Sequence, residues 1–348
     1  MNIIHILPEL EEGGVERLVP VYANGQSLLG HNVAVVSNGG KLESLLSDSV
    51  LHMKMPVHRK NPIVVTLCAL RIASIVRREN VSIVHAHSRI PAWICFLVKK
   101  LTPGVKFIYT AHSRFHSLNH STWPISRADG VICVSRSVLE SLKIWMLPQK
   151  IMRVIYNSIP ENAMKWRGSG DAAKKHLLFA GRISKIKGLL TLVESLKSVK
   201  NKNWSLDVLG DGPLAPRLRE LARELGLDDR ITLHGFHDDV AEFMSRCDLC
   251  LFPSFDEGLS LVLLGALMSG APVLASDITA NRELTSPVGE NPGGELLPPG
   301  DVHAWADAIE RFLDGGRPPS LGLDIKLPTT DEIIGQMMDF YEETLKRS

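Results

Sequence analysis

The chain of 348 residues has no long apolar stretch. The best candidates, 62–73 and 92–98, are broken or ended by Arg71 and Lys99, so neither reaches the roughly 18 uncharged residues of a membrane span. Its five cysteines form no even framework of spacings, which argues against a disulfide-stapled secreted fold. The N-terminus opens on a strand pattern rather than on a charged and then apolar leader. We therefore expect a cytoplasmic protein.

Net charge is nearly absent overall, at +1, yet the two halves differ. Residues 1–160 hold 18 Lys and Arg against 9 Asp and Glu, which gives +9. Residues 161–348 hold 21 against 29, which gives −8. A basic half of this kind suits an anionic partner, such as a membrane surface, a phosphate or nucleic acid, although it could also serve solubility alone. We expect peripheral contact with the inner face of an anionic membrane, and no nucleic acid.

Short apolar runs alternate with helical patterns in both halves, which is typical of parallel sheets built from βαβ units. The segment 157–174, with one proline and two glycines, lacks apolar periodicity and is interpreted as a linker beside a cleft. We expect domains at 1–160 and 161–328, followed by a C-terminal helix within 329–348. The expected strands are 3–7, 33–37, 81–85, 106–110, 130–134 and 152–155 in the first half, and 176–180, 205–209, 231–234, 249–252 and 272–275 in the second.

Glu257 is the most informative residue, because it lies where a strand pattern ends and a helix pattern begins. Leu249–Phe252 is an apolar run of strand length, and Leu259–Met268, ended by Gly270, predicts a short apolar helix. Open α/β sheets bind ligands at such points. Helix amides suit a phosphate and a carboxylate suits sugar hydroxyls, so a nucleotide sugar fits both.

The run from Phe252 to Val273 resembles the signature of family 4 retaining glycosyltransferases, which have the GT-B fold. In that signature a first Glu is followed, after seven residues, by a second Glu and Ala-Met-Ala-x-Gly-x-Pro-Val. The first Glu corresponds to Glu257 and implies contacts with donor-sugar hydroxyls. The second, a ribose ligand, is replaced by Gly265. The resemblance implies two Rossmann-like domains facing a cleft, with the C-terminal helix crossing back to the first domain.

Further motifs extend the resemblance over nearly the whole chain. Arg182 and Lys187 follow a strand and can direct two cations at a diphosphate. Thr110-Ala111-His112 matches a Thr-x-His motif whose histidine lies near the transferring sugar. The predicted catalytic residues are therefore Glu257, Arg182, Lys187 and His112. The predicted donor-binding residues are Gly13, Gly14, Gly181, Gly210, Gly235, Phe236, Gly258, Ser260, Leu261 and Val262.

Metal-ligand patterns are weak in this chain. No Asp-x-Asp pair occurs, which argues against a diphosphate held by a divalent cation. His85 and His87 alternate like a metal pair, but no acidic partner is evident in the sequence, and a core or loop role is favoured. Cys247 and Cys250 have ligand spacing without a second pair. We expect no metal and no cofactor.

The resemblance implies a retaining transferase that moves a sugar from a UDP- or GDP-linked donor to a hydroxyl of a glycan or glycolipid. The short sequence and basic first half suggest envelope polysaccharide or lipopolysaccharide assembly. Two alternatives remain, a GT-B sugar-nucleotide epimerase and a degenerate nucleotide-sugar binder in which Gly265 reflects lost turnover. Release of nucleoside diphosphate in the presence of an acceptor separates transfer from binding.

Overall fold

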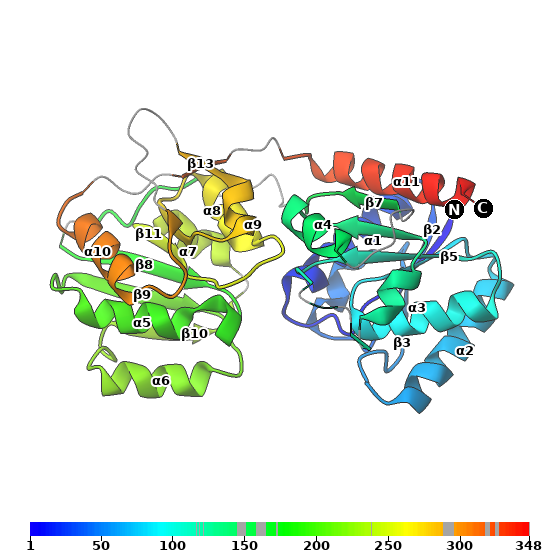
Figure 1. Cartoon of the computed structure of the whole chain (residues 1–348), viewed down its shortest axis with the longest axis horizontal. Coiled ribbons are helices and arrows are strands. Elements are labelled where there is room, and N and C mark those ends of the chain that lie inside the picture. Colours follow the sequence, from blue (N-terminus) through cyan, green and yellow to red (C-terminus); the bar gives the residue numbers. More distant parts are fainter. Residues whose placement is uncertain are drawn as a thin grey trace. The chain divides into compact units, whose positions relative to one another are not determined.

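Two compact units make up the protein, Met1–Ser158 with Leu327–Ser348, and Ile159–Lys326. The structure is a computed structural model (Figure 1). Each unit contains its own parallel sheet. The structure describes residues 1–347 apart from 116, 118, 121, 145–150, 158–164, 172, 238, 288–295, 317–320 and 324–326.

The first unit is built on a seven-stranded parallel sheet in the order β3-β2-β1-β4-β5-β6-β7. Strands such as β4 and β6 are buried at every position, as expected where helices cover both faces. All six strands predicted in this half are confirmed, whereas the half-exposed edge strand β3 was missed. The strands are β1 Asn2–Ile6, β2 Asn32–Ser37, β3 Leu51–Lys54, β4 Ile83–Ala86, β5 Lys106–Ala111, β6 Gly130–Cys133 and β7 Ile151–Val154.

The helices of the first unit pack in pairs, α2 against α3 and α1 against α11. The C-terminal helix α11, red in Figure 1, begins at a capping box formed by Thr329 and Glu332. It buries Phe340 and Tyr341 completely, so it is part of this unit's core. The helices are α1 Gly14–Leu28, α2 Pro62–Arg78, α3 Arg89–Leu101, α4 Arg136–Lys143 and α11 Thr330–Lys346, with 3₁₀ turns η1 Lys41–Leu45 and η2 Trp123–Arg127.

The second unit contains a six-stranded parallel sheet in the order β10-β9-β8-β11-β12-β14. The five strands predicted in this half are confirmed, and the two-residue β14 was missed. A separate antiparallel pair joins β13 (Thr285–Pro287) to β15 (Leu321–Leu323). The sheet strands are β8 Lys175–Ala180, β9 Trp204–Leu209, β10 Ile231–Gly235, β11 Leu249–Phe252, β12 Val273–Ser276 and β14 Leu296–Leu297.

The core of the second unit lies between its sheet and a layer containing α5, α6 and α10. Trp204 and Trp305 are its largest fully buried side chains. The helices α7 and α8 pack against each other. The helices are α5 Leu189–Ser198, α6 Ala215–Glu224, α7 Val240–Arg246, α8 Leu261–Ser269, α9 Thr279–Leu284 and α10 Val302–Leu313, after the 3₁₀ turn η3 Lys185–Lys187.

Part of the expected linker is attached to the second unit. Trp166 Nε1 donates to the Cys247 carbonyl over 2.8 Å, and Ser169 Oγ donates to both carboxylate oxygens of Asp248 at 2.9 and 2.8 Å. Pro160 and its neighbours lie outside the described residues. Over the ranges that the structure describes, no helix combines the length and apolarity needed to cross a bilayer.

Backbone segments approach one another very closely where the strands β8, β9 and β11 end. An ideal Cβ on Gly188 would lie 1.9 Å from the Pro253 carbonyl oxygen, and one on Gly210 would lie 2.1 Å from the Gly181 oxygen. Hydrogen bonds link the same loops, because Gly181 N donates to Leu209 O at 2.9 Å and Phe255 N to Ile186 O at 2.8 Å. Only glycine permits this packing. The loops at this sheet edge are therefore fixed against one another by direct backbone contacts.

We expect Gly188→Ala to destabilise the second unit more than Gly270→Ala does. Both glycines have positive φ, +68° and +79°, which costs an alanine about 1–2 kcal/mol. Only Gly188 faces a backbone atom, since nothing lies within 4 Å of the Cβ position at Gly270. Thermal unfolding of the two full-length variants gives the comparison, and equal melting temperatures would contradict the close backbone contact.

Candidate active site

Glu257 lies in the loop between β11 and α8, at the carboxyl end of the second sheet. The helix begins two residues later than expected, because Ser260 caps it by accepting a hydrogen bond from Leu263 N at 3.4 Å. The Glu257 side chain is only 12% exposed. Its Oε1 accepts from Lys187 Nζ at 2.5 Å and from Ser254 Oγ at 2.9 Å. In the described part of the chain, Oε2 has no hydrogen-bond partner.

The structure therefore brings together two predicted site residues that are 70 positions apart in sequence. Lys187 ends the 3₁₀ turn η3, directly before Gly188, and its side chain is 23% exposed. An ammonium group has three N–H donors, so the bond to Glu257 leaves two for a ligand. Ser254 was missed by sequence reasoning, although its position three residues before Glu257 in the same loop is the signal that could have identified it.

Arg182 lies on the same loop as Lys187 but is exposed. Among the residues that the structure describes, it forms no ion pair and no side-chain hydrogen bond. Within the described residues, no hydrogen bond or ion pair joins it to Glu257 or Lys187. A guanidinium without a protein partner keeps its whole donor fork available to an anion.

The remaining donor-side residues lie at the same sheet edge, in loops, at the end of a strand or in the first turn of α8. Gly181 and Gly210 follow β8 and β9, and Gly235 ends β10 and accepts a hydrogen bond from Gly210 N at 2.6 Å. Phe236 comes next. Gly258 precedes the cap of α8, and Leu261 and Val262 are half-exposed in its first turn, where amide N–H groups lack intrahelical partners. Gly265 lies in the interior of α8 and supplies no side chain to a ligand.

The first unit carries the other predicted residues. Gly13 precedes α1 in an extended conformation, and Gly14 begins the helix. The Glu16 carboxylate covers Gly13, because a Cβ there would lie 2.0 Å from Glu16 Oε2. His112 directly follows β5, and its Nε2 lies 3.3 Å from His87 Nδ1.

The other ring nitrogen of His112 is unusual. Nδ1 is buried, and the described residues offer it no hydrogen-bond partner. Burial lowers the pKa of His112 to about 4, so the ring is neutral at pH 7. A neutral imidazole next to a ligand offers one donor or one acceptor and no charge.

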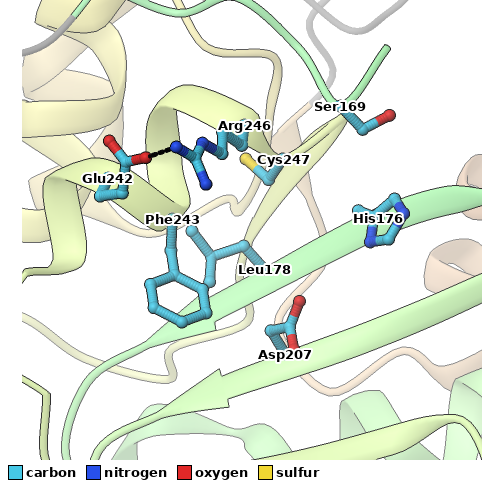
Figure 2. Close-up of a pocket in the computed structure, with 8 residues that line it drawn as sticks. All are labelled: Ser169, His176, Leu178, Asp207, Glu242, Phe243, Arg246 and Cys247. Atoms are coloured by element: carbon cyan, nitrogen blue, oxygen red, sulfur yellow. Dashed lines mark ion pairs between the residues drawn. The ribbon is translucent and has the colours of Figure 1, made fainter. Parts of the chain in front are cut away.

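A pocket of about 280 Å³ lies elsewhere in the second unit (Figure 2). Figure 2 shows Glu242 and Arg246 joined as an ion pair on α7, with His176 and Asp207 on the strands of the sheet. Asp207 Oδ1 is hydrogen-bonded to His234 Nε2 over 2.7 Å. The pocket includes none of the predicted site residues, and its acidic and basic groups pair with protein neighbours. The lining residues are Ser169, His176, Leu178, Asp207, Glu242, Phe243, Arg246 and Cys247.

Comparison with known proteins agrees with this geometry. Residues 12–162 match the model of "Glycosyltransferase Family 4", and residues 174–315 match "Glycosyl transferases group 1". N-acetyl-alpha-D-glucosaminyl L-malate synthase of Bacillus anthracis is 28% identical over 264 residues, which cover 70% of this chain and 68% of that protein. The lipopolysaccharide core biosynthesis mannosyltransferase LpsB of Rhizobium meliloti is 27% identical over 314 residues, 86% and 82% of the two chains.

The fold has close counterparts among solved structures. Anabaena Alr3699/HepE in complex with UDP and glucose superposes with a TM-score of 0.76 at 18% identity, over 99% of this chain and 95% of that one. Both halves of the chain match glycosyltransferase models, and the two parallel-sheet units have the GT-B architecture. The chain therefore belongs to the GT-B glycosyltransferases.

Proposed function

We propose that this protein transfers a sugar, with retention of configuration, from a nucleoside-diphosphate sugar to a hydroxyl of a glycan or glycolipid. The observation that carries the proposal is the cluster of Lys187, Glu257 and Ser254 at the carboxyl edge of the second sheet. It combines a carboxylate with a free oxygen and a cation with free donors. A sugar phosphate needs both of these groups.

Glu257 suits sugar binding because its Oε1 is fixed by two donors while Oε2 remains for a hydroxyl. A carboxylate engaged in this way is oriented and less nucleophilic, which supports a role in positioning the sugar rather than in forming a glycosyl-enzyme bond. In the proposed reaction the acceptor oxygen forms its bond to the anomeric carbon as the bond to the diphosphate breaks. The departing phosphate oxygen takes the acceptor proton.

Charge on the leaving diphosphate is balanced by the chain itself in this proposal. Lys187 provides a point charge and Arg182 a fork of donors, while the first-turn amides of α8 add the positive end of a helix. Such groups stabilise a developing anion without a metal ion. We propose metal-independent transfer on this basis.

The names of two relatives support the proposed donor and acceptor classes. LpsB acts in lipopolysaccharide core biosynthesis, and the Anabaena structure holds UDP and glucose. For the present chain we propose a UDP- or GDP-linked donor and an envelope polysaccharide or lipopolysaccharide acceptor. With Gly265 in place of a ribose ligand, the ribose must be held by other groups, so we expect the diphosphate and sugar contacts to dominate donor affinity.

A surface of α2 supports contact with a membrane-bound acceptor. Ile63, Leu67 and Leu70 are 70%, 60% and 48% exposed, and their spacing of four and three residues places them on one side of the helix. Segment 59–78 contains five basic residues and no acidic one. Apolar residues flanked by cations are typical of helices that lie on anionic lipid. We propose peripheral binding of this face at the inner side of the cell membrane.

We expect Glu257→Gln to lower turnover by roughly tenfold to a thousandfold, about 1.4 to 4 kcal/mol of transition-state stabilisation. Glutamine keeps the shape but loses the charge that strengthens the hydroxyl and Lys187 bonds. Ser254→Ala is the matched control, since it removes one partner of Glu257 and keeps the carboxylate, and its loss should be smaller. Full activity in a folded Glu257→Gln protein would refute the assignment.

Arg182→Ala and Lys187→Ala should each lower turnover, and the double variant should be little worse than the poorer single variant. Residues that act on the same charge behave as a unit. Steady-state rates at saturating donor, measured in excess chelator, test both parts. Strict additivity would argue against a shared diphosphate, and activity that returns only with added magnesium or manganese would contradict metal-independent transfer.

Vesicle binding tests the α2 surface. Changing Ile63, Leu67 and Leu70 together to Ser should weaken binding to anionic vesicles at least tenfold, since burying each aliphatic side chain contributes more than about 1 kcal/mol. Leu28→Ser with Leu29→Ser is the control, because these leucines are 86% and 58% exposed but have no Lys or Arg within 24–32. Equal sedimentation of the unaltered protein with neutral and anionic vesicles would remove the membrane proposal.

A further inference from the structure

A continuous hydrogen-bonded chain of buried side chains ends at His112. Gln26 Oε1 lies 2.8 Å from His5 Nε2, and His5 Nδ1 lies 2.9 Å from His87 Nε2. His87 Nδ1 in turn lies 3.3 Å from His112 Nε2. Gln26, His5 and His87 are almost completely buried. Helix α1 supplies Gln26 and strand β1 supplies His5, so two elements far from His112 in sequence determine its surroundings.

A fourth histidine belongs to a separate branch. His85 Nδ1 lies 2.6 Å from the Tyr341 hydroxyl of α11, and its Nε2 lies 2.7 Å from Thr110 Oγ1 on β5. The ring centroids of His85 and His87 lie 4.2 Å apart with the rings tilted by 32°, and no hydrogen bond joins these two side chains. The two rings therefore share packing and not protons, although Tyr341 of the second branch also interacts with the Gln26 side chain. Burial raises the pKa of the Tyr341 hydroxyl, and the interaction with Gln26 lowers it against that effect.

The same histidines have the composition of a metal site, since nitrogens of His5, His85 and His87 all lie within 4.8 Å of one another. Each of their six ring nitrogens already has a hydrogen-bond partner within the two branches. A metal would have to break at least two of these bonds, and no carboxylate belongs to the group to balance its charge. The geometry favours a hydrogen-bonded network.

The amide of Gln26 sets the direction of the protons. A carbonyl oxygen only accepts, so His5 carries its proton on Nε2 and its Nδ1 is an acceptor. His87 must then donate from Nε2, which leaves its own Nδ1 as an acceptor for His112. His112 therefore holds its proton on Nε2, and its Nδ1 keeps a lone pair with no partner among the described residues.

We propose that Gln26, His5 and His87 are positioning residues, which hold His112 in the tautomer with the proton on Nε2 and so present Nδ1 as a hydrogen-bond acceptor. Nδ1 can then receive a sugar hydroxyl, which has a hydrogen to donate, but not an ionised phosphate oxygen, which only accepts. This identification of the ligand group rests on the proposed sugar transfer.

Electrostatics agree with this arrangement. Burial lowers the pKa of His5 to about 4, and it lowers the pKa of His87 well below its usual value. All members of the chain are therefore neutral at pH 7, and a neutral imidazole has one donor and one acceptor. A protonated ring would have two donors, so the hydrogen bonds from Gln26 to His112 could no longer all run in one direction.

The tautomer can be read directly by nitrogen NMR of the full-length protein with ¹⁵N-labelled histidine. Long-range ¹H–¹⁵N correlations distinguish the two neutral forms, and His112→Gln identifies the signals of His112. We expect the Nε2–H form in the unaltered protein and in Gln26→Glu, which keeps the acceptor. Gln26→Met should give a mixture, since His5 then loses the one neighbour that can only accept a hydrogen bond and keeps only His87, which can donate or accept.

Thr110→Val is the matched control. It removes a buried hydrogen bond two residues from His112, but in the branch of His85, so the tautomer of His112 should not change. An Nδ1–H form in the unaltered protein, or an unchanged tautomer in Gln26→Met, would overturn the proposal. If Gln26→Met fails to fold, the unaltered protein and Gln26→Glu still give the decisive spectra.

Kinetics and metal analysis complete the test. Gln26→Met should lower kcat/KM for the donor about tenfold, and Gln26→Glu should retain it to within a few-fold. Stoichiometric zinc, nickel or copper in the purified protein would show that the histidines form a metal centre, and it would overturn the hydrogen-bonded network. The spectra need no substrate. A single Nε2–H tautomer of His112 in a protein without transferase activity would therefore refute the proposed function and leave the positioning role of Gln26, His5 and His87 intact.

Discussion

Backbone-to-backbone contact at one sheet edge is the constraint on which the candidate site depends. Gly188 lies against Pro253 and Gly210 against Gly181, at distances that no side chain could occupy. These contacts fix the loop that ends with Lys187 against the loop that carries Glu257. The 2.5 Å ion pair between them is therefore placed by main-chain packing. Charge attraction alone would leave two mobile side chains in water.

Most of the fold was predicted from local sequence patterns. Apolar runs of strand length identified both sheets, and Gly270 correctly marked the end of α8 because a left-handed residue ends a helix there. Edge strand β3 was missed because it has only four residues, Leu-His-Met-Lys, none of which is fully buried, so the run is too short to stand out. At the site, Glu257 was identified by its place after a strand. Its pairing with Lys187 depends on tertiary packing across 70 residues and has no local signal.

The histidines show the same limit more sharply. His85 and His87 drew attention by their spacing, and His112 by a family motif, but His5 had neither signal. Its role appears only when β1 and β4 pair in register, with His5 opposite His85. A sequence pattern can indicate that a histidine is buried. The partner of each ring nitrogen, and hence its proton, is set by neighbours up to 256 residues away.

The attachment of α11 to the first unit has a consequence for the order of folding during synthesis. Residues 159–326 form a compact unit inserted between two parts of the other unit. Tyr341 fills the interior beside His85, which precedes it by 256 residues. The inserted unit leaves the ribosome before α11 does, so it can fold first. Until α11 is made, the first 158 residues lack the helix that covers part of their hydrophobic core. A nascent chain halted before residue 330 would therefore expose the core surface that α11 normally covers, and chaperones could bind it there.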